Sequence, residues 1–132
     1  MMNNKGVALL LALFTLLIIA LLVVAFLETT TIDLQIVSNQ LNRNKALYIA
    51  DAGVEYAVSC LKSSKANVTY SAQLPLGSGD TYSVTYVSSS GIITSTGTLV
   101  SGESVKLEAK VSVTGAGTGI PYGVKILSWQ EK

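Results

Sequence analysis

The sequence predicts an α+β protein in which a long N-terminal helix packs on a small antiparallel β-sheet. Three observations favour this class. An uncharged apolar stretch fills Val7 to Leu27, and no Gly or Pro interrupts the chain from there to Ala52. Beyond residue 80, apolar and polar residues alternate with the period of two that β-strands require. The first half of the helix is expected to be transmembrane and the second half amphipathic.

Composition excludes several classes of function. The chain has 132 residues, of which 49% are hydrophobic and 13% charged, and its formal net charge is +1. This balance provides no basic field for nucleic acid, so we predict no nucleic-acid partner. There is no His and only one Cys, which excludes His-dependent acid–base catalysis, His-containing metal sites and an internal disulfide.

The segment from Val7 to Leu27 is predicted to span a membrane. Its only polar side chain is Thr15, and a helix of this length is roughly 30 Å long, the thickness of a bilayer core. Lys5 precedes the span and Glu28 follows it, so the positive-inside rule places the N-terminus in the cytoplasm. A cleaved secretory signal is the alternative, but the apolar stretch exceeds the usual signal length of about 7–15 residues.

The helix is expected to continue beyond the membrane as an amphipathic half, residues 28–62. Asn39–Lys45 is strongly polar and should face water or a partner. After it, apolar residues follow steps of three and four, as in a helix packed on a sheet: Leu47, Ala50, Val54, Ala57 and Leu61. We predict one helix roughly 80 Å long, which Gly53 loosens locally. The alternative is a break at the β-branched Thr29-Thr30-Thr31.

Residues 63–132 are predicted to form an extracytoplasmic β domain. Residues 63–80 are rich in Ser, Asn and Gly and are expected to be a loop, with a short strand as an option. Four strands are predicted after this loop, at 82–86, 92–100, 105–113 and 122–129. Such a sheet needs a covering element, and the apolar stripe of the helix is the one candidate.

Turns and breaks in the β domain follow from Gly and Pro. Hairpin turns are expected at Ser90-Gly91 and Ser101-Gly102, and a flexible turn at Gly115–Gly119. Gly97 should mark a bulge or a close approach of another backbone. Pro121 is expected to lead into the last strand.

Few residues suggest chemistry, and each has a simpler structural interpretation. The Gly-rich run 115–119 has no helix after it, so a turn is favoured over a phosphate-binding loop. Cys60 beside the core stripe is expected to be a packed residue. Asp51 and Glu55 lie one helical turn apart, and we favour a solvated or interface-facing acidic patch over a carboxylate pair. Asn67-Val-Thr69 is a formal glycosylation sequon. We predict no enzyme, no cofactor and no metal site.

One arrangement resembles a known family. A short polar leader ends in Lys5-Gly6, and a hydrophobic helix follows at once and continues into a small β domain. This resembles type IV pilins and pseudopilins. More narrowly, Ser38-Asn39-Gln40 and the run NKALYIADAGVE at 44–55 resemble PilX-type minor pilins, with Ala50-Asp51-Ala52-Gly53 as the most specific part. The resemblance covers about residues 3–62, and it implies a pilin-like fold.

The resemblance implies a processing site and a set of partners. Residues 1–6 would be a leader that a prepilin peptidase removes by cutting the Gly6–Val7 bond, and Val7 would then be N-methylated. The implied function is a membrane-anchored structural subunit of a pilus or pseudopilus filament. The implied partners are other pilin subunits, the peptidase, an inner-membrane assembly platform and the membrane. Asp51 and Glu55 are our candidates for contacts between subunits.

Three departures from the family pattern qualify the role. Major pilins usually carry Glu as the fifth residue of the mature chain, where this chain has Leu11. A carboxylate in lipid costs about 2.5–3.5 kcal/mol on insertion scales, so Leu11 removes that cost together with the contact the Glu makes to a neighbouring subunit. By analogy with tip pseudopilins, this favours a minor, tip-proximal subunit. Val7 replaces the common Phe, and there is no C-terminal Cys pair.

Two other classes of protein remain open. One is a single-pass membrane protein whose β domain binds something outside the cytoplasm without assembling. The other is a secreted soluble domain released after signal cleavage.

Overall fold

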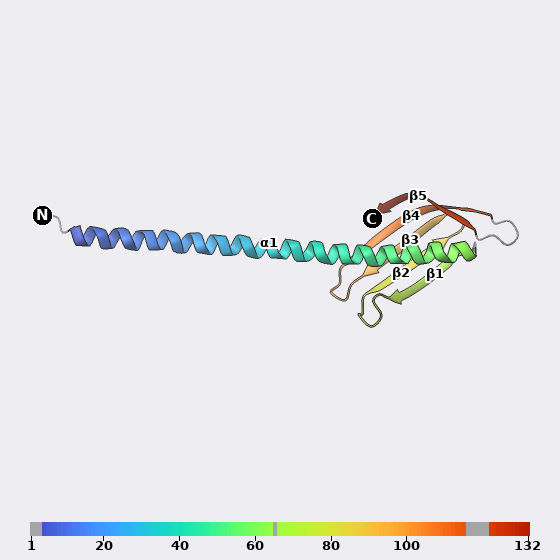
Figure 1. Ribbon diagram of the computed structural model, residues 1–132, viewed down its shortest axis with the longest axis horizontal. Helices are drawn as coiled ribbons and strands as arrows, with labels where there is room; N and C mark the ends of the chain where they lie inside the picture. Colours follow the sequence, from blue (N-terminus) through green and yellow to red (C-terminus); the bar gives the residue numbers. More distant parts are fainter. Residues whose placement is uncertain (1–3, 65, 116–121) are drawn as a thin grey trace. The chain divides into compact units, whose positions relative to one another are not determined.

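A computed structural model of the chain describes residues 4–64, 66–115 and 122–132. Within them lie one helix and five strands (Figure 1): α1 (Asn4–Ser63), β1 (Val68–Gln73), β2 (Thr81–Val87), β3 (Ile92–Thr98), β4 (Ser104–Thr114) and β5 (Gly123–Glu131). The α+β class with a helix packed on an antiparallel sheet is confirmed. By its internal contacts the chain divides into two compact units, Met1–Asn39 and Gln40–Lys132, which we describe separately.

The first unit is the N-terminal part of α1. The helix continues through Thr29-Thr30-Thr31 without interruption, so the alternative of two helices is wrong. Each of these three hydroxyls donates a hydrogen bond of 2.8–2.9 Å to the carbonyl oxygen four residues earlier, and Thr15 donates one of 2.8 Å to Ala12. Each of the four threonine hydroxyls in or beside the apolar span therefore donates a hydrogen bond to a backbone carbonyl oxygen.

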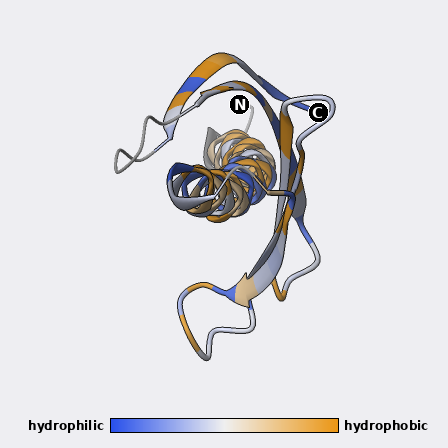
Figure 2. Ribbon diagram, turned by 90° about the vertical axis from the view of Figure 1, so that its right-hand side faces the viewer, coloured by the Kyte–Doolittle hydropathy of each residue, from blue (hydrophilic) through white to orange (hydrophobic). Residues whose placement is uncertain are grey.

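The second unit is a five-stranded sheet with the rest of α1 on one face. The strands follow one another in the order β1-β2-β3-β4-β5, and all four neighbouring pairs are antiparallel. Seen along α1 in Figure 2, the sheet curves around one side of the helix. The core lies between the two layers and combines the helix stripe with the inward side chains of the strands, among them Val84, Ile93 and Leu107.

The predicted helix stripe is the part of α1 that packs on the sheet. Ala50, Ala57 and Leu61 have no exposed surface and Val54 has 2%, while Leu47 is half-buried at the margin. The buried surface is wider than the stripe, because Ala46, Ile49 and Val58 also belong to the core. The helix side of the interface therefore consists mainly of small and β-branched side chains, which allow a close approach of helix and sheet.

Two glycines lie in the contact between helix and sheet. Gly53 on α1 faces the sheet, and Gly97 on β3 faces the helix. A Cβ at Gly97 on β3 would collide with the backbone of Ala46 and Ala50, so of the two expectations for Gly97 the close approach is the right one. A Cβ at Gly53 would collide with the side chain of Ser95. Gly53 therefore serves packing, and α1 is uninterrupted around it.

The short strand that the sequence left as an option within the loop 63–80 is present, as the edge strand β1. β1 pairs with β2 in continuous register, from Val68 opposite Tyr86 to Gln73 opposite Thr81. In β1 only Val68 and Ala72 are half-buried, and the other four residues are exposed. A strand at the edge of a sheet buries little apolar surface, so its alternation is weak.

The hairpin turns lie at two of the predicted positions. Gly91 and Gly102 have positive φ values of 65° and 99° in the turns after β2 and β3, a conformation that glycine adopts without strain. The third predicted turn and Pro121 fall largely outside the described residues. A β-bulge at Lys110/Val111 shifts the register of β4 with β5, and no residue type in the sequence signals it.

Candidate functional site

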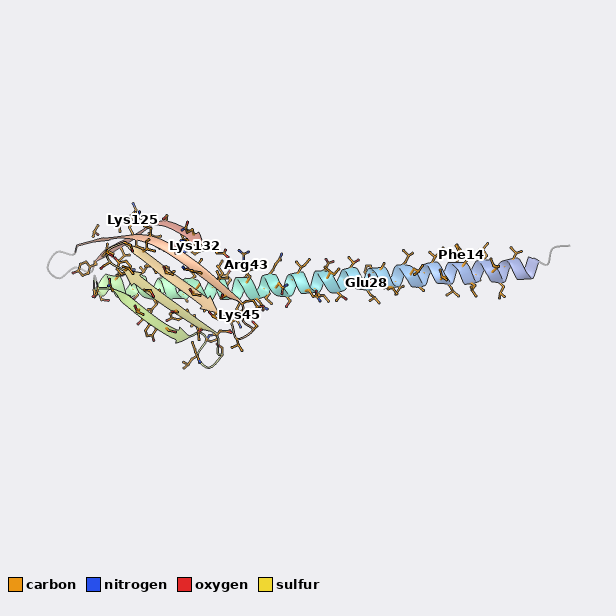
Figure 3. The ribbon with its side chains drawn as sticks, turned by 180° about the vertical axis from the view of Figure 1, so that it is seen from behind. Phe14, Glu28, Arg43, Lys45, Lys125 and Lys132 are labelled. Carbon is orange, nitrogen blue, oxygen red and sulfur yellow. The ribbon has the colours of Figure 1, made fainter. Side chains whose placement is uncertain are left out.

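The apolar surface of α1 is the most conspicuous functional feature. From Val7 to Leu27 every large apolar side chain is between 41% and 73% exposed, and the side chains project from the helix as Phe14 does in Figure 3. Burying one Leu, Ile, Val or Phe is worth about 1.5–3 kcal/mol, so this surface is not stable in water. The helix is long and apolar enough to cross a membrane, and no part of its apolar window is buried within the chain.

A shallow hollow on α1 belongs to this same surface. It is lined by Val24, Leu27, Glu28, Thr31 and Ile32, which are successive positions along one side of the helix. A depression between side chains of a bare helix has no opposite wall. It is therefore a surface for packing against lipid or another helix and does not form a ligand pocket.

The predicted processing residues lie at the start of α1. Gly6 is helical, and a Cβ added to it would meet nothing within 4 Å. Val7 is 53% exposed and Leu11 61%. Because Gly6 has no packing role, a substitution there tests processing without a direct effect on folding.

Asp51 and Glu55 share one helix face, as the spacing predicts. Asp51 is half-buried and Glu55 is exposed. Among the described residues, neither carboxylate forms a salt bridge. The structure thus brings the two side chains together and leaves them available, and their role between subunits stays a prediction.

Asn39–Lys45, here called the polar segment, connects α1 to the β domain of the same chain through three side chains. Lys45 Nζ lies 2.6 Å from Asp80 Oδ2, and Arg43 Nη2 lies 2.7 Å from Glu131 Oε1. Asn42 Nδ2 donates a 3.0 Å hydrogen bond to Glu103 Oε1. Arg43 and Lys45 lie on α1 beside the end of the sheet in Figure 3. The sequence indicates that this segment needs polar partners, but it does not reveal that the partners lie within the chain.

Asp80 is the central residue of this connection. It is 3% exposed, and its Oδ1 accepts a 3.0 Å hydrogen bond from the Val100 N–H. The hydrogen bond from Lys45, followed by that from Val100, holds the pKa of Asp80 below its usual value. One carboxylate thereby joins α1, the β1–β2 loop and the β3–β4 loop.

Two further carboxylates of the β domain are held in their charged form. The pKa of Glu108 is lowered mainly by its hydrogen bond with Lys132, whose Nζ lies 2.7 Å away. The pKa of Glu103 is lowered by hydrogen bonds from Ser101, its own backbone N–H and Asn42. Glu108 thus has a lysine as its partner, whereas Glu103 is held by neutral hydrogen-bond donors.

Cys60 lies in an aromatic cluster. The rings of Tyr56 and Tyr70 stack with centroids 4.3 Å apart, and Tyr82 lies 6.3 Å from Tyr56. The pKa of Tyr56 is raised, first by its hydrogen bond with Cys60 and then by desolvation. Cys60 is a free, half-buried thiol, in keeping with a packing role. In the described ranges, no group of three His, Cys, Asp or Glu side chains is placed to hold a metal ion.

The formal sequon is engaged in a turn. The Asn67 side-chain oxygen accepts a 2.8 Å hydrogen bond from the Ser88 N–H. This bond joins the start of β1 to the β2–β3 turn.

Comparison with known proteins finds a match over most of α1. Residues 5–55 match a protein-family model described as PilX N-terminal. No curated protein and no solved structure matches the chain. The matched range contains the apolar span, the polar segment, Asp51 and Glu55. The PilX-type family is structural rather than catalytic. The match supports a PilX-type N-terminal region of the type IV pilin class at residues 5–55, which make up fewer than half of the chain.

Proposed function

We propose that the protein is a minor type IV pilin or pseudopilin, a membrane-anchored structural subunit that enters or primes a filament. The observation that carries this proposal is the PilX-type match over a helix whose apolar surface has no partner in the described part of the chain. Such a surface can exchange lipid for neighbouring helices of similar apolarity, and no catalytic group is needed for that exchange.

Processing would release the helix for assembly. Residues 1–6 act as a leader, a prepilin peptidase cuts the Gly6–Val7 bond, and Val7 becomes N-methylated. Support comes from the open surroundings of Gly6, which no described side chain contacts. The chain's partners are then the peptidase, the inner-membrane assembly platform and other pilin subunits.

The proposed topology follows from charge. Lys5 before the span and Glu28 after it place the N-terminus in the cytoplasm and the β domain outside. The protein begins as a single-pass protein of the inner membrane and ends in a filament at the cell surface or in the periplasm.

Leu11 favours a position near the filament tip. With an apolar residue at this position, the subunit has no carboxylate to pair with the amino terminus of a neighbour. It also enters the membrane without the cost of burying a charge. Contacts on the β-domain side are assigned to Asp51 and Glu55, the two acids of α1 after residue 40, and neither has a salt-bridge partner in the described ranges.

Filament incorporation tests this function. The chain is expressed in its own host, and filaments are sheared from cells and probed for wild-type protein, Gly6→Val and the control Ala20→Val. Wild type and Ala20→Val should appear in the sheared fraction, whereas Gly6→Val should remain uncut in the membrane. Absence of wild type from filaments of piliated cells would contradict the proposal.

A single-pass membrane protein that does not assemble is the second candidate. The observation in its favour is Leu11, which removes one family contact between subunits. In that case both chains would stay uncut in the same location, and the mass of Gly6→Val would exceed that of wild type only by the added side chain.

A further inference from the structure

The outer face of β4 and β5 carries an excess of positive charge. This face points away from α1, because the alternate residues of β4 are buried against the helix. Four exposed lysines lie on or beside it, with Glu108 as the carboxylate between them. Lys106 lies 3.5 Å and Lys132 lies 2.7 Å from Glu108. Lys110 and Lys125, here called the basic pair, have no salt-bridge partner in the described ranges.

A hollow of about 130 Å³ opens on the same face beside the basic pair. It is lined by Ile92, Glu108, Lys110, Ser128 and Gln130. Ile92 gives the hollow an apolar wall, and the other side chains supply hydrogen-bonding groups. A side chain that is apolar in its body and polar at its tip, such as tyrosine, suits this lining.

The outer face of α1, which points away from the sheet, carries the complementary groups. Tyr48 is 71% exposed, and it shares one helix face with Asp51 and Glu55, which follow it after three and seven residues. The two acids are the only charges between Lys45 and Lys62. This stretch of the helix is therefore negative and presents one exposed aromatic side chain at its start.

β4 runs beside α1 in the same direction as the helix. Glu103, which precedes β4, accepts the hydrogen bond from Asn42 in the polar segment. At the other end, β4 pairs with the start of β5, and the preceding Tyr122 N–H donates a 3.0 Å hydrogen bond to the Lys62 carbonyl oxygen. Features along β4 and along α1 can therefore be compared in one common direction.

The order and the spacing of the two sets of groups agree. On the sheet the hollow comes first, then Lys110, and then Lys125, which lies opposite Ser112. About three strand residues, roughly 10 Å, separate the hollow from Ser112. On the helix Tyr48 comes first, and seven residues, again roughly 10 Å, separate it from Glu55. An aromatic ring followed by two acids thus matches a hollow followed by two lysines.

We propose that the outer face of α1 docks on the outer face of β4 and β5 of a second copy of this chain. Tyr48 enters the hollow, and Asp51 and Glu55 pair with the basic pair. Because the sheet curves around the opposite side of the helix (Figure 2), each copy keeps one surface free, and the contact repeats in one direction as in a filament. The inference rests on the proposed function and adds the surface that receives the two acids.

Cross-linking between copies tests the contact. Unlabelled and isotope-labelled full chains are mixed in phosphatidylcholine vesicles and treated with a carbodiimide, which joins carboxylates directly to amines. Peptides that link Asp51 or Glu55 of one copy to Lys110 or Lys125 of the other are expected, with one labelled half. Their yield should fall in high salt, because exposed charge pairs are screened. Absence of these mixed links would overturn the proposal.

Tyr48→Ala tests the hollow while it leaves every cross-linking group in place. Aromatic anchors carry much of the binding energy of an interface, so the yield of mixed links should fall about fivefold or more. The matched control is Leu76→Ala in the β1–β2 loop, which removes a side chain that is 94% exposed and should stay within about twofold of wild type. Unfolding midpoints of both variants are compared with wild type. Equal yields from two folded variants would contradict the assignment of the hollow.

Reciprocal charge reversal tests the pairing of the charges. One variant combines Asp51→Lys with Glu55→Lys, and the other combines Lys110→Glu with Lys125→Glu. Energy transfer between donor- and acceptor-labelled copies should fall about twofold or more in each variant alone, because like charges then face each other. Mixing the two variants restores opposite charges at every contact and should restore the transfer. A loss that mixing does not restore would overturn the pairing.

The two proposals fail in different ways. Wild-type chains that enter filaments but give no mixed links would contradict this contact and leave the proposed function intact. Chains that give the mixed links but retain residues 1–6 would contradict the proposed function and leave the contact intact.

Discussion

Two parts of the same helix use apolar residues for opposite purposes. From Val7 to Leu27 large apolar side chains cover all sides and are at least 41% exposed. From Ala46 to Leu61 apolar residues occupy one stripe, and the deepest of them are fully buried. The first part is composed mainly of Leu, Ile and Val, while the contact with the sheet uses Ala and Gly where the backbones come closest.

The difference shows how one helix can serve two environments. Lipid surrounds a helix uniformly and rewards large side chains in every direction. A sheet covers only one side of a helix, and small residues on that side allow a short distance between the helix and the sheet. The polar segment between them adds hydrogen bonds and ion pairs to the β domain, so that the second part of α1 is fixed by both packing and charge.

The largest effect on stability is expected from a side chain at the closest approach. Gly97→Val places atoms against the backbone of Ala46 and Ala50, which cannot move without separating helix and sheet. We expect a loss of about 3 kcal/mol or more in the unfolding free energy of the β domain, measured by denaturant titration in detergent. Gly115→Ala, which has open space around it, is the control and should stay within about 0.5 kcal/mol.

A leucine pair compares the two parts of α1 directly. Leu61→Ala removes a side chain with no exposed surface and should cost about 2–5 kcal/mol. Leu17→Ala, which is 52% exposed within the chain, should leave the same unfolding transition unchanged. Equal destabilisation by both variants would show that the two parts are not independent.

Acid should weaken the connection between α1 and the loops. The folded-state pKa of Asp80 lies below its unfolded value of about 3.9. Its stabilising contribution is therefore present above that value and is lost as pH falls through the folded pKa. Asp80→Asn should destabilise the domain at pH 7 and narrow the difference in unfolding midpoint between pH 7 and pH 3. The pKa values of Glu103 and Glu108 are also lowered in the folded state. The unfolding midpoint of Asp80→Asn will therefore still depend on pH to some extent.

The smallest effect on stability is expected at the proposed subunit contact. Asp51→Lys with Glu55→Lys reverses two charges that have no salt-bridge partner in the described ranges, so the unfolding midpoint should change little. Incorporation into filaments should fall, as measured by the amount of subunit in the sheared fraction. Normal incorporation would exclude this acidic pair as a contact.

Much of the fold could be predicted from the sequence because its signals are strong. An uninterrupted apolar span and steps of three and four fix the helix and its buried face. The strands β2 to β4 alternate clearly, and glycines mark their turns. β1 could be predicted only as an optional short strand within a loop, because its sequence, VTYSAQ, has only two half-buried residues. The bulge at Lys110/Val111 depends on how β5 fits against β4, a tertiary effect with no local signal.

The candidate functional residues divide in the same way, into those that a local pattern reveals and those that depend on the folded chain. Gly6, Val7 and Leu11 are local features of the chain and could be named from sequence and resemblance alone. The ion pair of Lys45 with Asp80 could not, because it joins residues far apart in the chain and depends on the folded loops.

The N-terminal residue of the mature protein tests the central claim most directly. The chain is purified from the membranes of its own host, and its intact mass and first residue are determined. A chain that begins at N-methylated Val7 is the predicted result, since it requires both the peptidase cut after Gly6 and the methylation. A chain that retains Met1 or Met2, or one that begins after Leu27, would contradict the proposed pilin function.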